Sequence, residues 1–284
     1  MTSLRLNVSK LPWQTRVDGL NNLSGLDKLI EIMSMLRDPE HGCPWDLKQD
    51  FASIVPHTIE EAYEVADAIE REDYPELKKE LGDLLFQTVF YAQLGQEQEL
   101  FDFQQVAEAM CDKLIRRHPH VFSSSEFADE LAIKANWEQE KAKERLESNA
   151  NNTSALDDIP QALPALSRSY KIQKRASSVG FDWPNITGVI DKIAEEVEEV
   201  REELTHSDKS IERIADEVGD LYFALTNLVR HLGLKPEQVV HQANKKFEAR
   251  FRLVEKLTSE PLNEMDIEQL ELLWQQAKNE LKNT

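Results

Sequence analysis

The feature that most constrains how this chain folds is an acidic pattern that occurs twice. In each copy, the sequence Glu-Glu-x-x-Glu is followed by Glu-x-x-Asp. The first copy spans residues 60–83 and the second spans residues 195–220. Because a pattern that recurs in the same order is typical of duplicated structural units, we expect the chain to be a tandem duplication.

A tryptophan with a lysine four positions later follows each copy at the same spacing. Trp137 lies 54 positions after Asp83, and Trp274 lies 54 positions after Asp220. The polar stretch that begins at Ser148 favours neither helix nor strand. The predicted organisation is an N-terminal extension (1–22), a first helical domain (23–147), a linker (148–165) and a second helical domain (166–284).

Both domains are expected to be all-α. The most frequent residues favour helices, and the 284-residue chain contains only 9 Gly and 11 Pro. Apolar residues recur at helical spacing between the sites where Gly, Pro or polar clusters interrupt the pattern. We predict helices at 25–37, from about 54 to 146 with breaks near 73 and 96–100, and from 166 onward with breaks at 180–184, 206–209, 233–236 and 261.

In the second half, the acidic residues fall along one edge of an apolar stripe. On a helix that turns about 100° per residue, the residues from Ile190 to Val200 form a stripe, and the residues from Ile211 to Leu221 repeat it 21 positions later. Each stripe carries a base and two acids in the same register: Lys192, Glu196 and Glu199 on the first helix, and Arg213, Glu217 and Asp220 on the second.

If these two helices pack as an antiparallel hairpin, their four carboxylates converge at the edge of the core. Such a cluster is unfavourable by itself because like charges repel, and a divalent cation removes that repulsion. Oxygen ligands without His or Cys suit Mg²⁺, with Mn²⁺ as a possible substitute.

The first half has the same acidic skeleton with different bases. Glu61, Glu64, Glu80 and Asp83 occupy the equivalent register, but His57 stands at the position of Lys192 and Glu76 at that of Arg213. A polyphosphate binds less well where two cations are lost and an acid is gained. We therefore predict that the second copy is the main catalytic one and that the first is weaker, differently specific or structural.

Charge and composition exclude several classes of function. The formal net charge of −20 opposes binding to a nucleic-acid backbone, so no nucleic-acid partner is expected. No apolar run approaches the length of a membrane span, and the first ten residues lack a secretory apolar region. Cys43 and Cys111 form no zinc or disulfide pattern. We expect a cytoplasmic protein without a membrane partner.

The acidic repeats, together with further short motifs, resemble the MazG nucleoside triphosphate pyrophosphohydrolases of the all-α NTP pyrophosphatase superfamily. The resemblance covers about residue 23 to the end. Besides the acidic repeats, the motifs that carry it are His41-Gly-Cys-Pro-Trp-Asp46, Arg117-His-Pro-His-Val-Phe122, Asn136-Trp-Glu138, Lys174-Arg-Ala176 and Val179-Gly-Phe-Asp-Trp-Pro184.

This resemblance implies a homodimer that uses Mg²⁺ to hydrolyse NTPs and dNTPs to monophosphates and pyrophosphate, and thereby controls or cleans the nucleotide pool. It implies that the metal ligands are Glu196, Glu199, Glu217 and Asp220. It also implies nucleotide contacts from Lys192, Arg213, Lys246 and Arg250, with Trp274 and Lys278 against the base or sugar. Arg213 stands where Lys is expected, and Asp216 stands where Glu is usual. Either Glu195 or Glu196 would accept the proton of the attacking water.

Three other interpretations agree with some of these sequence features. A dUTPase-like, dCTPase-like or phosphoribosyl-ATP-like pyrophosphatase would share the fold but accept fewer substrates. A di-iron protein would require two Glu-x-x-His pairs, and only Glu203-x-x-His206 is present. An acidic helical adaptor would use the same carboxylates to hold partners or calcium without turnover.

Overall fold

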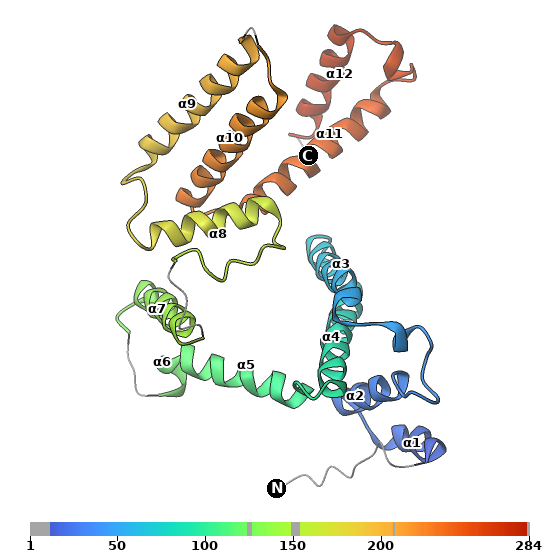
Figure 1. Cartoon of the computed structure of the whole chain (residues 1–284). Coiled ribbons are helices and arrows are strands. Elements are labelled where there is room, and N and C mark those ends of the chain that lie inside the picture. Colours follow the sequence, from blue (N-terminus) through green and yellow to red (C-terminus); the bar gives the residue numbers. More distant parts are fainter. Residues whose placement is uncertain (1–11, 124–126, 149–153, 207, 283–284) are drawn as a thin grey trace. The chain divides into compact units, whose positions relative to one another are not determined.

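The computed structural model describes residues 12–123, 127–148, 154–206 and 208–282. Within these ranges the chain is helical and contains no strand, which confirms the predicted all-α fold. Residues 1–141 and residues 142–284 form two compact units, called here the first and second units (Figure 1). None of the helices in the described ranges combines the length and apolarity needed to cross a bilayer.

The first unit has its core where three helices meet. Met33 of α2, Ile54 of α3 and Phe90 of α4 are almost fully buried against one another, with Val89 and Leu94 completing the cluster. Helices α3 and α4 form a hairpin, and α2 and α5 pack on α4. The elements are α1 (Trp13–Gly19), η2 (Leu20–Asn22), α2 (Gly25–Leu36), η3 (Asp46–Lys48), α3 (Phe51–Glu70), α4 (Tyr74–Glu97), α5 (Phe103–Arg117), α6 (Pro119–Phe122) and α7 (Glu130–Ser148).

Part of the segment expected as an N-terminal extension is helical. Helix α1 carries a buried Arg16, whose guanidinium donates to Glu31 Oε1 at 2.8 Å and to Ser34 Oγ at 3.0 Å, both on α2. Trp13 stacks on His41 with 4.8 Å between the ring centroids. Because α1 is held by polar and aromatic side chains, its sequence shows no helical repeat of apolar residues. The sequence therefore predicts no helix at this position. Residues 1–11 lie outside the described ranges.

The second unit consists of two helical hairpins and a helix that contacts both. Helix α9 packs along α10, α11 packs along α12, and α8 contacts α10 and α11 (Figure 1). The elements are α8 (Ala165–Ser177), α9 (Ile186–Thr205), α10 (Ile211–His231), α11 (Pro236–Leu257), η4 (Leu262–Glu264) and α12 (Ile267–Glu280). Every predicted break in this half coincides with a connection between these helices.

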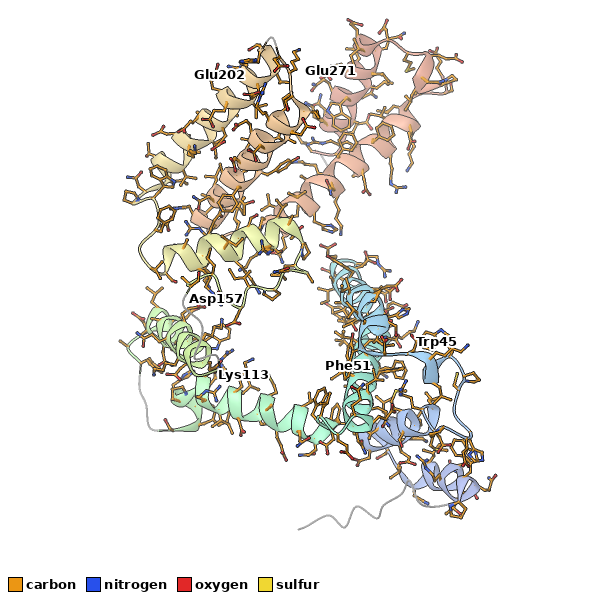
Figure 2. The ribbon with its side chains drawn as sticks, viewed as in Figure 1. Trp45, Phe51, Lys113, Asp157, Glu202 and Glu271 are labelled. Carbon is orange, nitrogen blue, oxygen red and sulfur yellow. The ribbon has the colours of Figure 1, made fainter. Side chains whose placement is uncertain are left out.

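The predicted linker is not a free connection over its described part. The boundary between the units falls inside α7, after Lys141. Ile159, in the segment before α8 that Asp157 marks in Figure 2, is 8% exposed and belongs to the second unit. This segment therefore contributes to the structure of the second unit. Residues 149–153 lie outside the described ranges.

Local sequence signals explain where the hairpin helices begin and end. Asn185 caps α9 by accepting from the Thr187 backbone N–H, and Ser210 caps α10 by accepting from that of Arg213. Gly180 and Gly233 follow α8 and α10 with φ of +88° and +72°, a conformation that glycine adopts without strain. Between these ends, α9 and α10 pack along one another.

Candidate functional site

Three acidic side chains meet between α9 and α10. Glu196 of α9 and Glu217 and Asp220 of α10 each offer a carboxylate oxygen, and these oxygens lie within 4.8 Å of one another. Glu196 is only 3% exposed, and its Oε2 has no hydrogen-bond partner in the described part of the chain. We call these three residues the second-unit carboxylate cluster. The structure thus brings together three of the four predicted metal ligands.

The fourth predicted ligand, Glu199, belongs to the same electrostatic environment. Burial raises the pKa of its carboxyl, and the charge of Glu196 raises it further. Burial also raises the pKa of Glu217, with added contributions from Glu196 and Asp216. These directions show that the charged carboxylates oppose one another in the absence of a cation.

The donor set therefore fits a hard divalent cation. It consists of oxygens alone, and one of its members, Glu196, has a buried oxygen without a hydrogen-bond partner in the described part of the chain. Mg²⁺ and Mn²⁺ prefer such carboxylate ligands. Glu196, Glu217 and Asp220 would hold the ion, with Glu199 beside them.

Lys192 is the cation closest to this cluster along α9. Its ammonium lies 2.6 Å from Glu195 Oε1 and 2.8 Å from Glu196 Oε1. Hydrogen bonds to Glu195 and then Glu196 raise the pKa of Lys192 well above its usual value, so the side chain is charged at neutral pH. Glu195, on the exposed side of α9, is thus held through the same lysine as the buried Glu196.

Arg213 does not share this arrangement. Its guanidinium donates to Glu203 Oε2 at 2.8 Å and to the backbone carbonyl of Asp208, in the connection between α9 and α10. The equivalent register with Lys192, read from the sequence, therefore does not give an equivalent contact. Asp216 is exposed, and its charge contributes to the raised pKa of Glu217.

The remaining predicted nucleotide contacts lie on the α11–α12 hairpin. Trp274 packs against Phe247 with 5.2 Å between ring centroids, and the Arg250 guanidinium lies 5.8 Å from the Trp274 ring centroid. Lys246 is exposed on α11, and Lys278 is partly buried on α12. Among the described residues, no hydrogen bond or ion pair joins these four side chains to the carboxylate cluster.

A cavity of about 750 Å³ adjoins the cluster within the second unit. Lys192, Glu196 and Asp220 line part of it, and apolar side chains, among them those of Phe181, Trp183 and Phe223, line much of the rest. Pockets of this size and mixture commonly bind small molecules. Three polar lining residues that the sequence pattern did not identify are Gln173, Asn227 and Arg230.

Some of the residues that line this cavity could have been found from the sequence. Phe181 and Trp183 belong to the motif at 179–184, which carried the resemblance without a role of its own. Phe223 and Asn227 continue the face of α10 that bears Asp220, three and seven positions later. No sequence feature indicated Gln173, because its position depends on how α8 crosses α10.

The first unit contains a similar cluster between α3 and α4. Glu61, Glu64 and Glu80 offer oxygens within 4.8 Å of one another. Burial raises the pKa of Glu64 and of Glu80, and the charge of exposed Asp83 adds to the shift of Glu80. At the position equivalent to Lys192, His57 lies 3.8 Å from Glu60.

Both clusters lie in segments that a protein-family model matches. The MazG nucleotide pyrophosphohydrolase domain matches twice, over residues 49–122 and 186–254. The chain belongs to the MazG family. The two matched segments include the α3–α4 and α9–α10 hairpins, which confirms the predicted tandem duplication.

Relatives of this MazG-family chain match it over most of its length. It is 51% identical over 261 residues to the nucleoside triphosphate pyrophosphohydrolase of Escherichia coli (strain K12), covering 91% of this chain and 98% of that relative. It is 40% identical over 255 residues to the nucleoside triphosphate pyrophosphohydrolase/pyrophosphatase MazG of Thermotoga maritima, covering 89% and 95%. A Mycobacterium tuberculosis nucleoside triphosphate pyrophosphohydrolase is 31% identical over 157 residues, which cover 55% and 46%.

Proposed function

We propose that the protein is a Mg²⁺-dependent nucleoside triphosphate pyrophosphohydrolase that converts NTPs and dNTPs to the monophosphate and pyrophosphate. The observation that carries the proposal is the carboxylate cluster of Glu196, Glu217 and Asp220, which adjoins a cavity large enough for a nucleoside. The E. coli and T. maritima relatives, which are named for this activity, support the same proposal.

The residues at the cluster suit phosphoryl chemistry. Hydrolysis of a phosphoanhydride depends chiefly on charge neutralisation and positioning, and a bound Mg²⁺ supplies Lewis acidity at the phosphate. Lys192 provides a cation for phosphate oxygens. Glu195 or Glu196 accepts a proton from the attacking water, and both contact Lys192. The apolar walls of the cavity keep water away from the bound nucleoside.

We assign the main activity to the second unit. Both units hold three carboxylates within the same distance, but among the described residues only the second cluster includes a buried acid, Glu196, and Lys192 contacts it. In the first, His57 replaces that lysine, and Glu76 replaces the second base. The first site is therefore weaker, differently specific or structural.

The proposal includes a homodimer that acts on free nucleotides in the cytoplasm and thereby controls or cleans the nucleotide pool. Apolar side chains on the α9–α10 hairpin, including Ile190, Val197 and Ile211, are exposed in the single chain, and a second copy would cover them. The α11–α12 residues, Lys246, Arg250, Trp274 and Lys278, are assigned to nucleotide contact in this assembly. The net charge of −20 favours free nucleotides over nucleic acid as partners.

Product analysis tests the reaction. Purified protein is incubated with each NTP and dNTP, with Mg²⁺, with Mn²⁺ or after chelation, and the products are separated by anion-exchange chromatography. The proposal requires monophosphate and pyrophosphate in the presence of metal and none after chelation. Nucleoside diphosphate and phosphate would place the cleavage at the wrong bond, and turnover of one base alone would favour a narrower pyrophosphatase. Nucleotide binding without turnover would favour the adaptor.

A further inference from the structure

One residue that lines the cavity of the second unit carries a buried polar atom without a partner in the described part of the chain. Gln173 of α8 is 7% exposed and lines the cavity. Its Nε2 donates to the backbone carbonyl of Phe223 at 2.7 Å. Its Oε1 is buried and has no hydrogen-bond partner in the described part of the chain. Buried acceptors are nearly always paired in native structures, so this one indicates a missing donor.

The orientation of the Gln173 amide follows from chemistry. The two ends of an amide are hard to tell apart by shape, and their assignment rests on the surrounding hydrogen bonds. A backbone carbonyl can only accept, so the end of Gln173 that faces Phe223 must be the NH₂ group. The other end is therefore the oxygen, and a ligand that satisfies it must bring an N–H or O–H group.

Asn227 of α10 presents the opposite polarity to the same cavity. Its Oδ1 accepts from Arg230 Nε at 3.1 Å and from Arg230 Nη2 at 2.8 Å. A guanidinium can only donate, so the oxygen of Asn227 must face it, and the NH₂ group is the end that remains for a ligand. Two lining residues thus have amide groups left for a ligand, an acceptor on Gln173 and a donor on Asn227. Every nucleobase carries a donor and an acceptor side by side on its hydrogen-bonding edge.

The spacing along α10 suits a nucleoside that extends from the carboxylate cluster. Asn227 is seven residues after Asp220, a rise of about 10 Å on an α-helix. Phe223 lies between them on the same face and, with Phe181 and Trp183, lines the cavity with flat apolar surface. A ribose and a base together bridge such a distance, with the base against the aromatic rings.

We propose that Gln173 reads the nucleobase of the substrate by accepting a hydrogen bond from an N–H group on the base edge, with Asn227 donating to the adjacent acceptor. This inference rests on the proposed nucleotide substrate and adds the residues that recognise the base. Leu156, from the segment before α8, lines the same cavity and contributes to its apolar wall.

Substrate pairs that differ by one amino group test this inference on the unmodified protein. Purine riboside triphosphate is ATP without its 6-amino group, and pyrimidin-2-one riboside triphosphate is CTP without its 4-amino group. Loss of the amine leaves Gln173 Oε1 unpaired in the complex, so kcat/KM falls on the order of 10- to 100-fold for each pair. Equal kcat/KM within each pair would overturn the inference and would mean that a water satisfies the oxygen.

Substitution of Gln173 then identifies the responsible atom. Gln173→Met keeps a side chain of similar size but removes the acceptor, so the preference for the amine-bearing nucleotide falls to within about twofold. Lys171→Met, an exposed change on the same helix, keeps the preference of the wild type. Persistent discrimination in Gln173→Met would overturn the inference while leaving the proposed function intact. Absence of turnover of every nucleotide by the wild type would overturn the proposed function and this inference with it.

Discussion

The ammonium of Lys192 lies 2.8 Å from the buried carboxylate of Glu196, one helical turn further along α9. The second oxygen of Glu196 has no hydrogen-bond partner among the described residues, and Glu196 is a member of the carboxylate cluster. A single buried acid therefore connects a cation that suits phosphate to a set of ligands that suits a metal ion. In the first unit, histidine stands at the position of this lysine.

Replacing Lys192 by Met is expected to raise KM for the nucleotide by about 10-fold or more, because a hydrogen bond to a charged phosphate oxygen is lost. Steady-state kinetics at saturating Mg²⁺ measure the effect. Arg201→Met is the matched control, since Arg201 is exposed on the same helix and pairs with Glu198. A KM for Lys192→Met within twofold of the wild-type value would exclude Lys192 from phosphate binding.

Mg²⁺ is expected to stabilise the second unit against heat. At 100 times its dissociation constant, an ion that binds only the folded state adds about 2.7 kcal/mol, which corresponds to a rise in Tm of roughly 5–10 °C for a unit of this size. Glu217→Gln removes a charged ligand and should reduce the shift. Differential scanning calorimetry with and without Mg²⁺, with NaCl at equal ionic strength as the control, measures it. A full shift in Glu217→Gln would show that the ion binds elsewhere.

The second unit is expected to lose stability in acid through Asp182. Burial acts to raise the pKa of this carboxyl, but hydrogen bonds from Arg230 and His231 outweigh it and lower the pKa below its usual value. The stabilisation is therefore complete above the unfolded-state pKa of about 4 and is lost as the pH falls through the lower pKa of the folded state.

Asp182→Asn should accordingly be less stable than the wild type at pH 7, and the difference should shrink below pH 4. Free energies of unfolding from urea titrations across this range provide the measurement. Asp191→Asn, at an exposed aspartate of α9, is the control and should follow the wild type. A difference between Asp182→Asn and the wild type that stays constant with pH would contradict the assigned ion pair.

The α11–α12 hairpin is expected to depend on Trp274. Its ring packs on Phe247 and on the Arg250 guanidinium, so Trp274→Ala should cost about 2 kcal/mol of unfolding free energy, whereas Trp274→Phe keeps the aromatic contact and costs less. Urea titration measures both variants. Equal stability of Trp274→Ala and the wild type would mean that the ring does not support the hairpin.

The features that depend on local sequence were predictable. The all-α fold, the breaks between the helices and the duplication follow from apolar spacing and from turn residues such as Gly180 and Gly233. The meeting of Glu196, Glu217 and Asp220 was predictable from register once the two helices were taken to pack as a hairpin, because helices with the same stripe then bring the same edge together.

The features that depend on tertiary contacts were not predictable. Helix α1 is held by the buried Arg16, whose partners lie at least fifteen positions away in the sequence. The contact of Arg213 with Glu203 depends on the turn between α9 and α10, and the helical spacing of residues does not predict that contact. The hydrogen bond of Gln173 to Phe223 depends on the contact between α8 and α10, and no pattern within one helix predicts that contact.

The most direct test of the account compares two equivalent substitutions, Glu196→Gln in the second unit and Glu61→Gln in the first, by their rates of monophosphate and pyrophosphate formation from each nucleotide. Both remove one charge from a carboxylate cluster and relieve repulsion, so both variants should fold. We expect Glu196→Gln to lose at least about 100-fold in kcat/KM, since changes merely adjacent to metal ligands already cost up to that much. Glu61→Gln should keep at least about half of the wild-type rate. The opposite result, with activity lost in Glu61→Gln and kept in Glu196→Gln, would place the main site in the first unit and contradict the account.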